Sequence, residues 1–417
     1  MRLAWTILHR WIGLGIAGFL FVSGLTGAVI SWDHELDELL NPHLTEARVA
    51  GVALPPLDLV ERVEARDPRL RVASFPFAVE PGEAMPISVR PTVDPATGKL
   101  HELGFNQVFL DPATGEQLGA REWGAAWPIN RETFVSFLYK LHYSLHLPEI
   151  WGVDLWGRWL LGAVAIVWTI DCFVGFYLTL PTRRSARHGR SWWLRWKPAW
   201  QIKVSGSRYR VAFDIHRAFG LWLWAMLLTI AFTGFSLNLY REIFYPLMSL
   251  VSQVTPNIFS QQPPAGRHQP IEPAMGYREI VERARSEVAR RGWSEPMGSA
   301  FYTPGFGIYG VRFHRTGADR GAAGVGPAIL YFDGRTGASL GARQPWTGTA
   351  ADIFLQAQFP LHSGRILGLS GRVLISVMGL VVAALSVTGV VIWYRKRRAR
   401  LAVRRGRAER ANLAPAE

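Results

Sequence analysis

The stretch Leu8-His9-Arg10-Trp11-Ile12-Gly13-Leu14 places a histidine and an arginine near the start of a long apolar segment. The same pattern returns 207 residues later as Ile215-His216-Arg217-Ala218-Phe219-Gly220-Leu221, and Thr26-Gly27 recurs as Thr233-Gly234 at the same offset. Two matches in one register indicate an internal duplication rather than a chance tripeptide. The rest of the chain can therefore be compared as two related halves.

A second pair of segments is related in the same way. Leu155-Trp156-Gly157-Arg158 corresponds to Leu369-Ser370-Gly371-Arg372, and Gly175 corresponds to Gly389, at a shared offset of 214 residues. Each half therefore contains two apolar segments, and the order of the motifs is the same in both halves.

The composition is typical of a membrane protein. Of the 417 residues, 49% are hydrophobic and 18 are tryptophan, which exceeds the usual share in a soluble enzyme. The single cysteine, Cys172, excludes an intrachain disulfide and a Cys-x-x-Cys-His motif, so any haem must be held non-covalently. The formal charge of +14 could suggest nucleic acid, but the basic residues cluster beside the apolar segments. We therefore expect a lipid bilayer, and no nucleic acid, as the partner.

Four apolar segments are long enough to cross a bilayer, which takes about 20 helical residues. The first could also be a signal peptide, but it is too long and lacks an Ala-x-Ala cleavage site, so we expect it to remain as a span. The basic segments that follow the second and fourth spans belong in the cytoplasm by the positive-inside rule. The expected transmembrane helices are 3–32, 154–180, 211–240 and 366–394, and the expected cytoplasmic segments are 181–210 and 395–417.

The two remaining segments, 33–153 and 241–365, each predict a small α+β domain outside the cytoplasm. Both contain a helix pattern followed by alternating strand patterns and a turn signal, Asp111 to Gly115 in the first and Asp333 to Gly337 in the second. The expected helices are 56–64, 131–146 and 272–291, and the clearest strands are 71–79, 85–90 and 106–110. The predicted fold class is therefore a membrane α-helical protein with four transmembrane helices in two parallel span-domain-span repeats.

Histidines lie at equivalent depths in the two halves. His9 and His216 are near the cytoplasmic ends of their spans, whereas His142, His146 and His362 are near the outer ends. Polar side chains at such depths face the interior of a helix bundle, and two facing imidazoles can supply both axial ligands of a haem iron. We therefore predict two haem b sites, an inner site of His9 with His216 and an outer site of His362 with His142 or His146.

The choice between the two outer candidates stays open. His142 and His146 are four residues apart and share a helical face. Leu141-His142 matches Leu361-His362, which favours His142. However, the spacing from His142 to the next span is six residues longer than in the second half, which keeps His146 as a candidate.

Three charged residues are further candidates. Arg10 and Arg217 directly follow the inner histidines, and they could pair with haem propionates or extend to lipid headgroups. Asp171 lies deep in the second span, where the other half has Leu385. A carboxylate there could accept a hydrogen bond from a histidine, carry a proton or pair with an arginine.

Together these motifs resemble the PepSY-associated transmembrane-helix family, and among its members the inner-membrane ferric-siderophore reductases. The resemblance rests on the four histidine motifs and the two Asp-x-x-Thr-Gly turns. It implies two PepSY-like periplasmic domains and a dihaem b protein that carries electrons outward to reduce a ferric chelate. Because the chain has no fused flavoprotein domain, we expect a separate electron donor in the cytoplasm or membrane.

Two other classes of function compete with this ferric-chelate reductase. A non-redox PepSY regulator or anchor would bind a peptide or protease through its outer domains, and it would bind no haem. A transporter would need paired broken spans with charged midplane residues in both halves, and Asp171 is the only such residue in the sequence. An absorption spectrum before and after reduction separates the reductase from the anchor.

Overall fold

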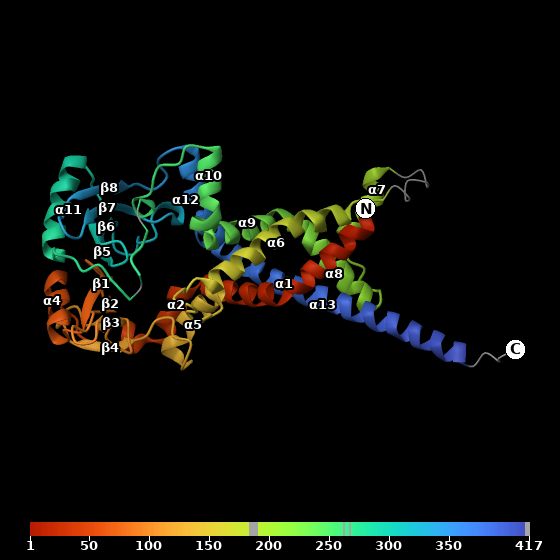
Figure 1. Cartoon of the computed structure of the whole chain (residues 1–417), viewed down its shortest axis with the longest axis horizontal. Helices are drawn as coiled ribbons and strands as arrows, with labels where there is room; N and C mark the ends of the chain where they lie inside the picture. Colours follow the sequence, from red (N-terminus) through yellow and green to blue (C-terminus); the bar gives the residue numbers. More distant parts are fainter. Residues whose placement is uncertain (183–190, 262, 267, 413–417) are drawn as a thin grey trace.

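A bundle of long helices and a β-sheet lie at opposite ends of the molecule (Figure 1). The computed structural model describes residues 1–182, 191–261, 263–266 and 268–412. The N-terminus and the far end of the last helix, α13, both lie at the end of the bundle that is remote from the sheet. The long helices therefore connect two chemically different ends.

Within the described residues, three helices are long and apolar enough to cross a membrane, and a bent pair can make a fourth span. The three are α1 (Arg2–Ile30), α6 (Trp156–Thr179) and α13 (Gly368–Asn412), and the bent pair is α8 (Arg208–Trp222) with α9 (Trp224–Asn238). Shorter helices join them: α2 (Asp33–Leu40), α3 (Pro42–Thr45), α5 (Arg131–Ser144), α7 (Trp192–Trp196), α10 (Tyr245–Val251) and α12 (Ala350–Ser363).

The predicted uninterrupted helix at 211–240 is divided in the structure. α8 and α9 meet at Leu223 with a bend of 73°. α8 carries Asp214, which is fully buried and accepts hydrogen bonds from Arg210 and Arg217 on the same helix. The backbone before α8 also donates to this carboxylate, whereas α9 is apolar and packs along α6. The polar half is thus held by the preceding loop while the apolar half follows the bundle.

Both basic segments contain helix that the sequence did not predict. α13 continues past the expected end at residue 394, because no helix-breaking residue interrupts 395–405, and it reaches Asn412. In the expected loop 181–210, residues 183–190 lie outside the described part of the chain, and so do residues 413–417 of the tail. The described remainder of the loop begins with α7, which presents exposed Trp192 and Trp193.

One antiparallel sheet of eight strands contains strands from both halves (Figure 1). The order is β4-β3-β2-β1-β5-β6-β7-β8, so that β1 and β5 join the halves at the centre. The two soluble segments, which we expected as separate domains, thus share one sheet. The strands are β1 (Leu70–Pro76), β2 (Met85–Pro91), β3 (Gln107–Leu110), β4 (Gln117–Arg121), β5 (Met297–Thr303), β6 (Ile308–Phe313), β7 (Ala328–Asp333) and β8 (Ser339–Arg343).

Two helices, α4 (Pro56–Arg66) and α11 (Tyr277–Arg291), cover the face of the sheet that is turned away from the bundle (Figure 1). Leu59 of α4 and Ile280 of α11 are buried against strand residues such as Ile87, and they form one core with strands of both halves. Alternation of buried and exposed positions along β1 and β5 is what a sheet with one covered face requires.

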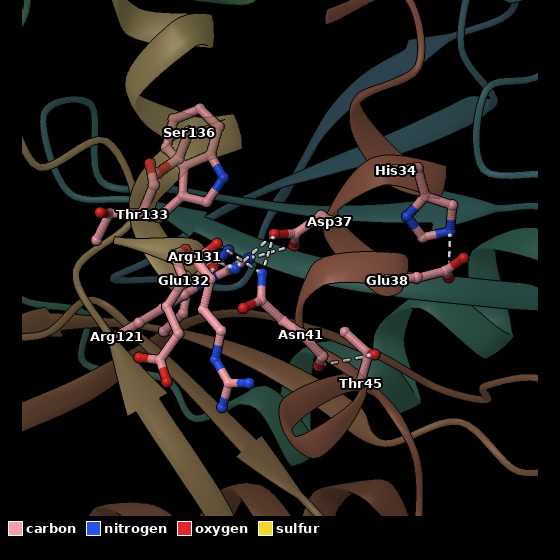
Figure 2. A network of polar contacts seen from close by, with 12 residues as sticks. His34, Asp37, Glu38, Asn41, Thr45, Arg121, Arg131, Glu132, Thr133 and Ser136 are labelled. Carbon is pink, nitrogen blue, oxygen red and sulfur yellow. Dashed lines mark hydrogen bonds and ion pairs between the residues drawn. The ribbon is translucent and has the colours of Figure 1, made fainter. Parts of the chain in front are cut away.

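A polar network connects the sheet to the helix bundle (Figure 2). Arg121, at the end of β4, donates to both carboxylate oxygens of Asp37 in α2, at 2.7 and 2.6 Å, and to the carbonyl oxygen of Glu132 in α5. Asn41 donates to Asp37 and to the first backbone carbonyl of α5. Because Arg121 is buried, these charge-assisted bonds fix the start of α5 relative to the sheet.

Candidate functional site

The structure brings four of the five candidate histidines together in two pairs. The ring centres of His9 in α1 and His216 in α8 are 6.3 Å apart, and those of His142 in α5 and His362 in α12 are 6.1 Å apart. We call His9 with His216 the inner pair, because His9 lies near the start of α1, and the N-terminus is at the end of the bundle remote from the sheet (Figure 1). We call His142 with His362 the outer pair. Each pair combines one histidine from each half.

The two pairs are separated along α1. His142 contacts α1 at Ser23 and Thr26, which follow His9 by 14 and 17 residues. At a rise of 1.5 Å per residue these contacts lie about 21 to 26 Å from His9 along the helix. The pairs therefore span most of the hydrocarbon thickness of about 30 Å.

The helices that carry the outer histidines begin with the same kind of cap. The Asn130 side chain accepts from the backbone N–H of Thr133, whose hydroxyl oxygen accepts in return from the Asn130 backbone. Thr349 and Asp352 form the equivalent capping box at the start of α12. Such boxes satisfy otherwise unpaired N–H groups and define where a helix starts. Both outer histidines then fall in the last turn of their helices.

The outer rings form their hydrogen bonds to the described residues through Nδ1. The Nδ1–H of His142 donates to the carbonyl oxygen of Ser23 at 3.0 Å and to the hydroxyl oxygen of Thr26 at 3.1 Å. The Nδ1–H of His362 donates to the hydroxyl oxygen of Thr233 at 2.9 Å. Both hydroxyl groups donate their own hydrogen to a backbone carbonyl one turn earlier, so their oxygens can only accept here. This arrangement assigns the proton to Nδ1 and leaves Nε2 with a free lone pair.

The inner rings use Nδ1 in the same way. The Nδ1–H of His9 donates to Oδ1 of Asp171 at 2.9 Å. The Nδ1–H of His216 donates to the carbonyl oxygen of Leu385 and to the hydroxyl oxygen of Thr388, both at 3.1 Å. Asp171 and Leu385 occupy matching positions in the two halves. One position thus supplies the acceptor in both halves, through a carboxylate in the first and the backbone in the second.

A glycine lies beside each of the four rings. A Cβ added at each glycine would approach Cε1 of the ring: Gly27 at 2.9 Å from His142, Gly234 at 3.6 Å from His362, Gly175 at 3.5 Å from His9 and Gly389 at 3.4 Å from His216. These matches between the halves therefore have a physical reason. The Thr-Gly matches provide an acceptor and space for the outer imidazoles, and the match of Gly175 with Gly389 provides space for the inner ones.

A cavity of about 860 Å³ surrounds the inner pair. Its walls are largely apolar and include Trp168, Phe176 and Leu227, and among its lining residues Asp171 is the one carboxylate. This volume is within the range of small-molecule and cofactor sites. Basic side chains also line it: Arg2, Arg10, Arg217, Lys396, Arg397, Arg400 and Arg404. The cavity could therefore hold a flat apolar group that carries negative charges at one edge.

The charged candidates from the sequence all lie at this cavity. Arg10 and Arg217 line it, and the Arg217 guanidinium also donates to Asp214 and to the carbonyl oxygen of Pro198. Asp171 forms its ion pair with His9, and no arginine in the described part of the chain pairs with it. Of the roles considered for Asp171, the geometry favours that of a hydrogen-bond acceptor for a histidine.

His146 lies outside both pairs because α5 ends at Ser144. Leu145 and His146 adopt left-handed backbone conformations, with φ of 54° and 51°. The His146 ring stacks on Phe137 at 4.6 Å, and its Nε2–H donates to the carbonyl oxygen of Phe137 at 2.9 Å. The additional residues after His142 thus form a loop before α6 rather than another turn of helix.

The spacing of the rings in each pair is the one that two histidines would need to hold a haem between them. Within the described residues, no cluster of three or more His, Cys, Asp and Glu side chains could hold a bare metal ion. Two imidazoles on one iron place their ring centres about 6 Å apart, because each nitrogen lies about 2 Å from the metal and the ring centre about 1 Å behind it. The separations of 6.3 and 6.1 Å match this value. Acceptors at Nδ1 are also what metal-ligating histidines ordinarily have.

Some residues of the candidate site were not identified from the sequence. The four glycines and the two threonines were recognised as repeat matches only, although their recurrence next to the histidine motifs was a usable signal. Lys396, Arg397 and Arg400 were assigned to a basic tail, because a sequence does not show that α13 returns them to the cavity around His9.

Apolar spanning helices with a sheet at one end define the chain as a multi-pass membrane protein. The sequence model of the family described as the PepSY-associated TM region matches residues 6–396, and the chain belongs to this family. The matched range includes both histidine pairs and the whole sheet. A search of curated proteins found no match to the chain.

Proposed function

We propose that this chain is an inner-membrane haem b protein that passes single electrons from a cytoplasmic-side donor to the periplasm, where it reduces a ferric siderophore. The observation that supports this most directly is the spacing of the two histidine pairs, in which all four Nδ1 atoms are hydrogen-bonded and no Nε2 atom bonds to a described residue. A haem held by two histidines would supply one-electron transfer at each pair.

In this proposal the chain crosses the membrane four times, in two parallel span-domain-span repeats, with α8 and α9 together as the third crossing. The basic segments around α7 and the end of α13 then lie in the cytoplasm, together with both termini, and the sheet lies in the periplasm. Electrons enter at the inner pair and leave at the outer pair, close to the sheet.

In this proposal, the protein's side chains bind and orient the two haem groups. His9 and His216 would hold the inner haem, and His142 and His362 would hold the outer one. Basic side chains of the cavity, Arg10 among them, neutralise carboxylates at the edge of the inner group through charge-assisted hydrogen bonds. The apolar helices exclude water from the space between the pairs.

The proposed reaction transfers one electron from the donor to one ferric ion. The donor loses one electron, and one ferric ion of the chelate becomes ferrous. Ferrous iron is the softer ion and binds hard oxygen ligands less tightly, so that reduction releases it from a siderophore. No proton or group transfer is required.

Haem content of the purified full-length protein tests the proposal. A pyridine haemochrome assay should give about two haems per chain, extractable by acidified organic solvent because no covalent attachment motif exists. His216→Ala and His362→Ala should each lose one haem, and the two should differ in the spectrum of the haem that is left. His146→Ala is the matched control and should retain both.

Protein without haem would refute the proposal and favour a non-redox regulator or anchor that binds a peptide or protease. If His216→Ala and His362→Ala gave identical spectra, each having lost both haems in a folded protein, the division into two sites would be wrong.

A further inference from the structure

The two pairs differ in the charge of the groups that hold their rings. In the outer pair the acceptors are the hydroxyl oxygens of Thr26 and Thr233 and the carbonyl oxygen of Ser23, all neutral. In the inner pair, one ring donates to neutral oxygens but the other donates to the carboxylate of Asp171. Among the described residues that hydrogen-bond the four rings, Asp171 is the one that can carry charge.

Asp171 is placed where a charge has a large effect. The residue is 7% exposed and lies in the middle of α6, and its hydrogen bond to His9 is 2.9 Å long. Of the basic residues that line the cavity, Arg10 and Arg217 directly follow the inner histidines, and Arg217 already pairs with Asp214. Exposed charges are screened by salt over about 10 Å, whereas a buried carboxylate in direct contact is screened much less.

A carboxylate at this position would lower the reduction potential of an iron that His9 binds. Oxidised iron carries one more positive charge than reduced iron, and a negative group bonded to its ligand stabilises the oxidised form. The hydrogen bond also makes the imidazole a stronger electron donor through its other nitrogen, with the same direction of effect. Hydrogen bonding and charge near the site are among the means by which proteins adjust haem potentials.

We propose that Asp171 sets the direction of electron flow by making the inner haem harder to reduce than the outer haem. The inference rests on the proposed function, since it needs haem at both pairs. One electron from the cytoplasmic-side donor then moves from the lower to the higher potential, and one ferric ion at the periplasmic side is reduced. Asp171 is a positioning residue in this role, because it acts through His9 and touches neither the metal nor the substrate.

Redox potentiometry of the full-length protein tests this role. The side chain in Asp171→Asn keeps the shape and an accepting oxygen but loses the charge. The inner midpoint potential should rise by at least about 59 mV. For one electron this corresponds to a tenfold change in the ratio of oxidised to reduced iron. The outer midpoint potential should stay the same. Measurement in the His362→Ala and His216→Ala backgrounds assigns the shift, which should occur in the first and be absent from the second.

Two further variants complete the design. Asp171→Leu carries the residue that the second half has at the matching position, and it should raise the inner potential at least as far. Thr26→Val removes a neutral acceptor from the outer pair and should leave the inner potential unchanged.

The failures of the two proposals are distinguishable. Wild-type protein without haem overturns the proposed function and this inference with it. Two haems with an inner potential that is unchanged or lowered in both Asp171 variants overturn the inference alone. Loss of the inner haem from both variants would also overturn it, because Asp171 would then serve only to hold the ring of His9.

Discussion

At Gly27 there is no room for even one additional carbon atom. A Cβ there would lie 2.9 Å from Cε1 of His142, closer than real Cβ contacts, whereas at Gly234 the same atom would meet His362 at an ordinary 3.6 Å. The two glycines match in sequence, so a sequence alone treats them as equivalent. The structure separates them by 0.7 Å of clearance, and this difference can be measured.

Gly27→Ala should displace the His142 ring and remove the outer haem, while Gly234→Ala should retain both haems. Overpacking of this kind typically costs about 1–3 kcal/mol unless the neighbour moves, and here the neighbour is a proposed ligand. Haem content and the low-spin absorption band of each purified variant provide the measurement. Equal haem content in the two variants would contradict the role assigned to Gly27.

The same residue scale shows what a sequence can and cannot determine about the site. His9, His216 and His362 were identified because their motifs repeat in register, and the structure brings His9 beside His216. The choice between His142 and His146 could not be made from spacing, since it depends on where α5 ends. That end is set by the left-handed backbone after Ser144, where the residues are not glycines. Pro148 indicates that the helix ends nearby, but it does not specify the residue at which it ends.

At the scale of elements, an ion pair attaches α2 to the sheet end of α13. Arg372 donates to Glu35 at 2.7 Å and to the carbonyl oxygen of Ser31, and its guanidinium lies over the ring of Trp32. This guanidinium holds the pKa of the Glu35 carboxyl at about 2, below its usual 4.5. The first and last long helices of the bundle are thus held together where they approach the sheet.

The lowered pKa of Glu35 predicts acid sensitivity with a definite sign. The ionised pair contributes its full stability above about pH 4.5 and loses it as the pH falls toward about 2. The thermal unfolding temperature should therefore decrease less between pH 5 and 3, by roughly 1–3 °C, in Glu35→Gln than in the wild type, since a half-exposed pair contributes at most about 1 kcal/mol. Glu46→Gln, just after α3, removes no ion pair among the described residues, so it is the control and should behave as the wild type. An equal decrease in all three proteins would show that the pair contributes nothing.

Element boundaries also show which part of the fold was predictable. β1, β2, β3 and α4 were expected within a few residues, because alternating hydrophobicity and turn signals are local. The division of 211–240 into α8 and α9 was not expected, because α8 is joined to the preceding loop by bonds of Lys203 and Arg217 that pattern alone does not reveal. The pairing of β1 with β5, which merges the two outer segments into one sheet, joins strands more than 200 residues apart.

For the whole molecule, the proposed orientation can be tested by fusion to alkaline phosphatase, which is active only outside the cytoplasm. Fusions after Glu122, which follows β4, and after Arg343, which ends β8, should be active because both positions lie at the sheet. A fusion after Val204, in the basic loop before α8, should be inactive. Matched expression levels are the control, and the reverse pattern would invert the proposed orientation.

The continuous sheet and the shared histidine pairs show what a chain with two joined halves can do that a dimer of identical halves cannot. Every pair uses one histidine from each half, and β1 and β5 meet at the centre of the sheet. Two identical half-length chains could build the same contacts as a symmetric dimer, but symmetry would then give the inner pair either no aspartate or two. Joining the halves in one polypeptide removes that restriction. A single carboxylate can then be placed beside one ring only. Its charge of one unit equals the charge of the one electron that is transferred.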